Sequence, residues 1–164
     1  MTTPIETPVE VKPLWRVLAG VEAGIVAGAV MLAYIMLDAL LRGSSVWTVV
    51  NLFSSNFYGA AALGGAFRRT TVAGLAWHFW WSGVLGLAIS LVLRPFLRRP
   101  SRCALVGALL AMGWYYCVVR FLWPQWNPLA GRYQPFPGLL VAHLLFGMAM
   151  GTYPRFLTEL REKP

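Results

Sequence analysis

Four apolar segments, each long enough to cross a lipid bilayer, constrain how this chain can fold more than any other feature. They cover about residues 14–41, 71–93, 103–123 and 138–157. A helix needs about 20 predominantly apolar residues to span the hydrocarbon core. Lipid offers the backbone no hydrogen-bonding partner, so such segments pair their own N–H and C=O groups as helices. We therefore predict an all-α membrane protein built as a bundle of four transmembrane helices.

The composition agrees with this fold class and limits the domain organisation. Hydrophobic residues make up 58% of the chain and charged residues 12%, whereas soluble domains average roughly 45–50% and about 25%. With 164 residues, we expect one membrane domain over residues 14–157, between cytoplasmic tails at 1–13 and 158–164. This leaves no room for a separate soluble catalytic domain.

The distribution of basic residues predicts how the spans are oriented. The chain has a formal net charge of +8, and its arginines lie at the ends of apolar segments, where lipid headgroups satisfy them. We therefore do not expect a nucleic-acid partner. One side of the predicted membrane holds nine basic residues: Lys12, Arg16, Arg94, Arg98, Arg99, Arg102, Arg155, Arg161 and Lys163. The other side holds five: Arg42, Arg68, Arg69, Arg120 and Arg132. By the positive-inside rule, we expect a protein of the bacterial inner membrane with both termini in the cytoplasm.

The two loops on the opposite side are unusually apolar. Residues 44–70 are too apolar for a free loop and too interrupted by glycine for a fifth span, so we expect an interfacial or re-entrant segment. Residues 124–138 contain four prolines, which favour a stiff, extended cap anchored by aromatic side chains at the headgroups. Both loops are therefore expected to lie against the membrane domain.

The only two histidines occur in matching frames with four-residue spacing. The frames are His78, Ser82 and Gly86 in the second span, and His143, Gly147 and Gly151 in the fourth. This spacing places each frame on one helix face, where small residues allow close helix packing. The shared frame also suggests that the two halves of the chain are duplicated helical hairpins.

Two further groups of residues are candidates for packing or for a site. Gly20, Gly24 and Gly28 form a face of small residues on the first span, typical of close helix–helix contact. Asp38 and Arg120 fall near the outer ends of the first and third spans, so we expect a polar cluster there. Ionisable groups at such positions usually face the bundle interior.

Three interpretations of the histidines remain open. In the first, Asp38 pairs with Arg120, and the histidines satisfy hydrogen bonds within the bundle. In the second, His78 and His143 are axial ligands of a tetrapyrrole, either haem b or a chlorophyll-type pigment. In the third, the histidines bind a quinone or a lipid headgroup. We expect no other metal site.

The chain resembles uncharacterised bacterial four-helix integral membrane proteins with glycine-rich first and third helices and a His-x3-small-x3-Gly frame opening helices two and four. The residues that carry the resemblance are Gly20, Gly24, Gly28, Gly107, Gly113 and the two histidine frames. The likeness covers most of the chain and implies the fold rather than a biochemical role.

Reaction motifs typical of hydrolases and NTPases are missing from the sequence. We therefore expect a non-catalytic subunit that packs, with other membrane proteins and lipid, in an electron-transfer or photosynthetic complex. The alternatives are a small tetrapyrrole-binding electron-transfer protein that uses His78 and His143, and a protein that binds quinone or lipid.

Overall fold

The computed structural model describes residues 12–96, 99–134 and 136–162, so most of the predicted tail at 1–13 lies outside the described residues. The described chain is helical, and no strand occurs in it. Within these ranges, three stretches are long and apolar enough to cross a membrane: Pro13–Leu41, Arg69–Phe96 and Pro100–Trp126. The prediction of an all-helical protein with membrane-spanning segments is confirmed at this level.

The first three predicted spans correspond to three long helices. They are α1 (Pro13–Leu41), α4 (Arg69–Leu93), which ends in the short turn η2 (Arg94–Phe96), and α5 (Pro100–Cys117). A wide π-helical turn, η3 (Val118–Leu122), continues α5 into α6 (Trp123–Trp126). Such turns place one extra residue in the helix and change the direction of the side chains that follow.

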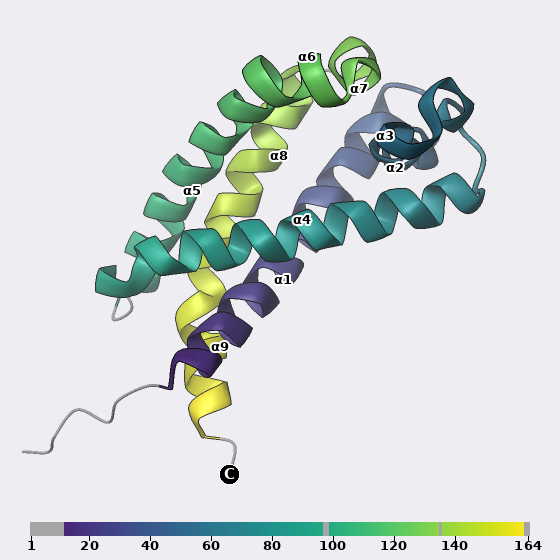
Figure 1. Cartoon of the computed structure of the whole chain (residues 1–164). Helices are drawn as coiled ribbons and strands as arrows, with labels where there is room; N and C mark the ends of the chain where they lie inside the picture. Colours follow the sequence, from purple (N-terminus) through teal and green to yellow (C-terminus); the bar gives the residue numbers. More distant parts are fainter. Residues whose placement is uncertain (1–11, 97–98, 135, 163–164) are drawn as a thin grey trace, which may run out of the picture.

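The predicted fourth span is divided into three elements. They are α8 (Phe136–Ala149), η4 (Met150–Thr152) and α9 (Tyr153–Arg161), which follow one another towards the C-terminus (Figure 1). With 14 residues, α8 is about 21 Å long, which is shorter than the hydrocarbon core. Pro154 lies in the first turn of α9, where its missing N–H and its ring interrupt regular α-helical pairing with the turn before it.

The long helices pack as two hairpins that meet along α1 and α8. The most extensive contacts join α1 to α4 and α5 to α8, and α1 also packs on α8 and α9. Figure 1 shows α5 and α8 running side by side, while α4 crosses α1 obliquely. The core is continuous through this junction and includes Ala23, Ile35, Ala142 and Phe146.

The segment at 44–70 folds into short helices over the start of α4. These are α2 (Trp47–Phe53), α3 (Ser55–Tyr58) and η1 (Gly59–Ala62). Asn51, which is 1% exposed, holds the segment together. Its amide nitrogen donates to the carbonyl oxygens of Gly64 (2.8 Å) and Ala66 (3.0 Å). Its oxygen accepts from the Thr71 hydroxyl (2.6 Å).

The prediction of an extended, proline-stiffened cap at 124–138 was wrong. The chain there is helical, with α6 followed by α7 (Pro128–Tyr133). Pro124 and Pro128 each lie in the first turn of a helix, where the missing N–H would have no intrahelical partner in any case. The side chain of Asn127 caps α7 by accepting from the backbone N–H of Ala130 (3.0 Å).

A buried polar contact ties the two loop segments to each other. The Ser55 hydroxyl, at the start of α3, donates to the side-chain oxygen of Asn127 (2.8 Å). Both side chains are buried, so the bond is shielded from competing water. Residues that are 72 positions apart thereby form one cap over this end of the bundle.

Candidate functional site

A cavity of about 150 Å³ lies between the two hairpins, beneath this cap. Both histidines line it, together with a wall that is mostly apolar and aromatic. The remaining lining residues used below are Phe53, Asn56, Trp77, Trp81, Ser82, Trp114, Trp126 and Asn127. An apolar cavity of about this volume accommodates one six-membered ring.

The imidazole of His78 is fixed by contacts from α1 and α2. Its Nε2 lies 2.9 Å from the carbonyl oxygen of Gly28 on α1. Its ring stacks on Phe53, with the centroids 5.2 Å apart and the planes 9° from parallel. The side chain of Ser82 lies one turn further along α4 and donates to the His78 carbonyl (2.8 Å). These contacts hold the imidazole between α1, α2 and α4.

His143 is fixed from within its own helix. Its Nδ1 lies 2.9 Å from the carbonyl oxygen of Leu139, one turn earlier in α8. The Tyr115 ring of α5 meets the imidazole at an interplanar angle of 60°, with centroids 5.5 Å apart. His143 is 5% exposed, so this imidazole is almost completely enclosed by the bundle and the cavity.

These hydrogen bonds determine which nitrogen of each ring carries the proton. A carbonyl oxygen can only accept, so Nε2 of His78 and Nδ1 of His143 must donate. In a neutral imidazole the second nitrogen is then an acceptor. Among the described residues, the single fully enclosed side-chain atom without a partner is Oε1 of Gln134. The second nitrogen of each ring has no hydrogen-bond partner among the described residues, and both histidines line the cavity.

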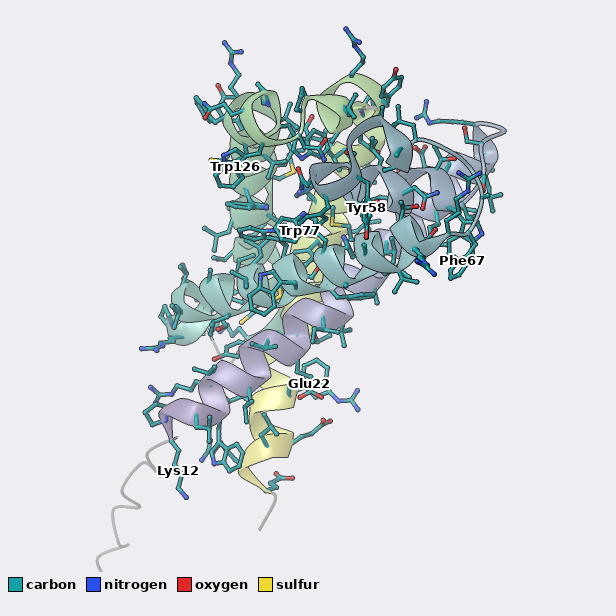
Figure 2. All side chains as sticks on the ribbon, turned by 45° about the vertical axis from the view of Figure 1, so that its right-hand side comes forward. Lys12, Glu22, Tyr58, Phe67, Trp77 and Trp126 are labelled. Carbon is teal, nitrogen blue, oxygen red and sulfur yellow. The ribbon has the colours of Figure 1, made fainter. Side chains whose placement is uncertain are left out.

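Tryptophans form the side of the cavity where α4 and α5 face each other. Trp81 of α4 and Trp114 of α5 approach with centroids 6.1 Å apart, and Trp77 meets Trp81 edge-on at 5.6 Å. Figure 2 labels Trp77 and Trp126, which lie on α4 and on the helical segment that continues α5. Trp126, which also lines the cavity, is 62% exposed, so this side of the cavity adjoins the surface of the bundle.

Asn56 of α3 connects the two hairpins at this side. With its amide oxygen towards the indole of Trp77, it accepts from Nε1 (3.1 Å), and its amide nitrogen donates to the Trp126 carbonyl (2.9 Å). Asn56 is exposed, unlike Asn127. The hydrogen bonds of Asn56 can therefore break without leaving its amide both buried and unpaired.

The small residues of the first frame lie where α1 and α4 meet. A methyl group added to Gly86 would lie 2.6 Å from the Gly20 carbonyl oxygen, and one added to Gly28 would lie 2.6 Å from Cβ of Ser82. A methyl group on Gly24 would lie 2.8 Å from Cα of Gly86. These helices thus meet backbone to backbone, which places His78 within reach of Gly28.

The small residues of the second frame have the same role between α5 and α8. A methyl group on Gly147 would lie 2.6 Å from the backbone nitrogen of Ala108, and one on Gly151 would lie 3.0 Å from Cβ of Ala104. In both hairpins, the histidine stands at the end of the frame nearer the cap and the small residues follow. The hairpin duplication itself stays a prediction.

The predicted pairing of Asp38 with Arg120 is not what the structure shows. Asp38 pairs with Arg42, one turn along α1, at an N–O distance of 3.0 Å. The hydrogen bond and the charge of Asp38 raise the pKa of the Arg42 guanidinium above its usual value. Arg120 is exposed. The nearer partner is favoured because i and i+4 side chains are neighbours on a helix.

Asp38 has a second neighbour that the sequence did not indicate. A methyl group on Gly138 would lie 3.1 Å from the carboxyl carbon of Asp38. Gly138 belongs to the first turn of α8, where unpaired N–H groups and the helix dipole favour negative charge. Asp38 therefore faces the start of the helix that carries His143.

The asparagines at 51, 56 and 127 are the polar residues that the sequence reasoning missed. Each lies in a stretch that is otherwise apolar or aromatic. Buried amides need partners, so an asparagine within such a stretch is a signal for a structural hydrogen bond. The sequence gives no indication of which residues these amides contact.

Comparisons with known proteins assign the chain to no family. No protein-family model, curated protein or solved structure matches the chain. Within the described residues, no three His, Cys, Asp or Glu side chains are grouped to hold a metal ion. Cys103 and Cys117 are free.

Proposed function

We propose that this chain is a non-catalytic integral membrane protein that binds the ring of a quinone-type ligand between its two hairpins. The observation that carries the proposal is the cavity of about 150 Å³, lined by both histidines and an aromatic wall. Ligand pockets typically combine an apolar lining with a few polar groups that orient the ligand. Here the imidazoles would orient the ring, and a lipid tail would leave between α4 and α5.

The tetrapyrrole alternative is less well supported by this geometry. A macrocycle contains four pyrrole-type rings, whereas the cavity has room for about one ring. Haem ligation through Nε2 of His78 would also break its hydrogen bond to Gly28. The absorption spectrum of the purified protein tests this alternative. A Soret band that is lost in both His78→Ala and His143→Ala would establish it in place of the quinone proposal.

We further propose four membrane crossings, with α8, η4 and α9 as the fourth, in a bacterial inner membrane. Quinone chemistry requires an electron donor or acceptor, so the protein would work as a subunit beside an electron-transfer or photosynthetic partner. Solubilisation in a mild detergent should then yield a large, co-purifying assembly. A stable monomer as the sole species in native membranes would contradict the subunit proposal.

The binding proposal is tested by titrating a decyl-tailed benzoquinone into the protein in lipid nanodiscs and measuring heat. We expect saturable, one-to-one binding that weakens at least about fivefold in Trp81→Ala, since base-sized aromatic contacts contribute about 1–3 kcal/mol. Trp80 is the matched control, because it neighbours Trp81 on α4 but is 65% exposed and does not line the cavity. Equal loss in Trp80→Ala, or no saturable heat in the unmodified protein, would contradict the proposal.

A further inference from the structure

We infer that one face of α1 binds a transmembrane helix of a partner protein, and that this helix carries an arginine or a lysine opposite Glu22. This outward face of α1 comprises Glu22, Val26, Ala29 and Ala33. The inference rests on the proposed role as a subunit, and it adds where the partner binds and which charge the partner contributes. None of the four residues lines the cavity, so the contact is separate from the proposed ligand site.

The outward face of α1 follows the helical repeat. Its four residues are spaced three or four positions apart and are all exposed. Such spacing places their side chains on one side of the helix, away from the buried glycines that pack on α4. Figure 2 labels Glu22 in the half of α1 that lies away from the cap. The rest of the described chain therefore leaves this side of α1 uncovered.

Glu22 lies within the apolar span and not at its end. Gly20 of α1 meets α4 at Ser90, since a methyl group on Gly20 would lie 3.0 Å from Cβ of Ser90. Arg16 and Arg94 each lie one turn from this contact, towards the predicted cytoplasmic side, and mark the level of the headgroups. Glu22 lies about 9 Å further along the helix than Arg16. Its side chain is shorter than those of arginine and lysine, which reach the headgroups from such depths.

Within the described part of the chain, no basic side chain pairs with this carboxylate. The ion pairs there join Arg42 to Asp38 and Arg155 to Glu159. An ionisable group inside the membrane is costly, and it usually faces a bundle interior or pairs with an opposite charge. Because Glu22 is exposed on the outward face, the opposite charge has to come from another molecule. In the apolar surroundings of the span, such a pair attracts more strongly than it would in water.

The small residues of the outward face favour a helix as the source of that charge. Ala29 and Ala33 lie one turn apart, on the same side of α1 as Glu22 and deeper in the span. Small residues at this spacing allow two helices to approach closely. The amine of a lipid lies at the headgroups and gains nothing from these alanines. A partner helix gains both the close packing along the alanines and the ion pair at Glu22.

Photo-crosslinking in native membranes tests the inference. A benzophenone amino acid replaces Val26, one turn from Glu22, in the full chain. The matched control carries it at Leu109 of α5, which is 65% exposed but does not belong to the outward face. At position 26 we expect an adduct with a transmembrane peptide of another protein that contains arginine or lysine, and no such adduct at position 109. An adduct at position 26 with lipid alone, or with a second copy of this chain, overturns the inference.

Substitution of Glu22 then tests the ion pair. Glu22→Gln removes the charge with little change of shape, and loss of one member of a desolvated charge pair weakens binding at least about tenfold. We therefore expect the adduct at position 26 to fall at least about fivefold. Glu22→Arg, combined with glutamate at the crosslinked partner's basic residue, should restore it. An unchanged yield in Glu22→Gln overturns the ion pair.

The outcomes separate this inference from the proposed function. Glu22 does not line the cavity, so Glu22→Gln should bind the decyl-tailed benzoquinone in nanodiscs as tightly as the unmodified protein does. A large assembly that persists in full in Glu22→Gln overturns the inference and leaves the subunit role in place. A stable monomer as the sole species in native membranes contradicts the subunit role, and the inference with it.

Discussion

At the scale of single residues, both histidines and the buried asparagines Asn51 and Asn127 have defined hydrogen-bond partners. The sequence predicts that His78 and His143 face the interior, because they share a helix face with small residues. It does not predict their partners. The bond to Gly28 depends on how closely α1 approaches α4, and the bond to Leu139 depends on the rotamer of His143.

Asn51 provides the sharpest prediction at this scale. In Asn51→Ala, the exposed carbonyls of Gly64 and Ala66 and the buried hydroxyl of Thr71 lose their partner. Leaving the buried group unpaired costs about 1–3 kcal/mol. We expect the segment at 44–70 to exchange its amide hydrogens at least about tenfold faster, as measured by mass spectrometry. Gln125→Ala, at an exposed position, should leave the exchange unchanged. Undisturbed exchange in Asn51→Ala would refute the role of Asn51.

At the scale of helices, the small residues predict where two helices pack closely. Hydropathy does not predict where a helix ends or is interrupted. Gly24 and Gly86 meet because neither has a side chain to separate the helix axes. The interruption at Met150–Thr152 and the helical form of 124–133 escape a hydropathy profile. Both depend on whether a proline lies in the first turn of a helix or within it, and this is decided by packing.

Glycine substitutions test the packing of α1 on α4. In Gly86→Val, the new side chain would overlap the backbone of α1 at Gly20 and Gly24, and overpacking typically costs about 1–3 kcal/mol. We expect a loss of free energy of unfolding of that size or greater in detergent titrations. Gly113 is the matched control, because a methyl group there meets nothing within 4 Å. Comparable losses in Gly86→Val and Gly113→Val would contradict close packing at Gly86.

At the scale of the whole molecule, composition predicts the class, and the position of the cavity follows from contacts between distant residues. A sequence of 58% hydrophobic residues leaves few alternatives to a helical membrane protein. The cavity, in contrast, needs the cap formed by Ser55 and Asn127 and the divergence of two hairpins. Neither is encoded in local periodicity, so neither could be predicted.

The proposed orientation is tested by cysteine labelling in a background where Cys103 and Cys117 are replaced by serine. Tyr58→Cys lies in the cap and Arg161→Cys at the end of α9. If both termini are cytoplasmic, a membrane-impermeant maleimide labels Tyr58→Cys in spheroplasts and labels Arg161→Cys only after lysis. Labelling of Arg161→Cys in intact spheroplasts would show that the orientation is reversed.

The hydrogen bond between Ser55 and Asn127 affects how the dissociation constant of a ligand should be expressed. With the cap joined across its buried centre, a ligand that enters between α4 and α5 arrives from the lipid phase and not from water. Occupancy then depends on the mole fraction of ligand in the bilayer. An apparent dissociation constant expressed per volume of water will therefore change with the amount of lipid in the sample, while one expressed per lipid will stay constant.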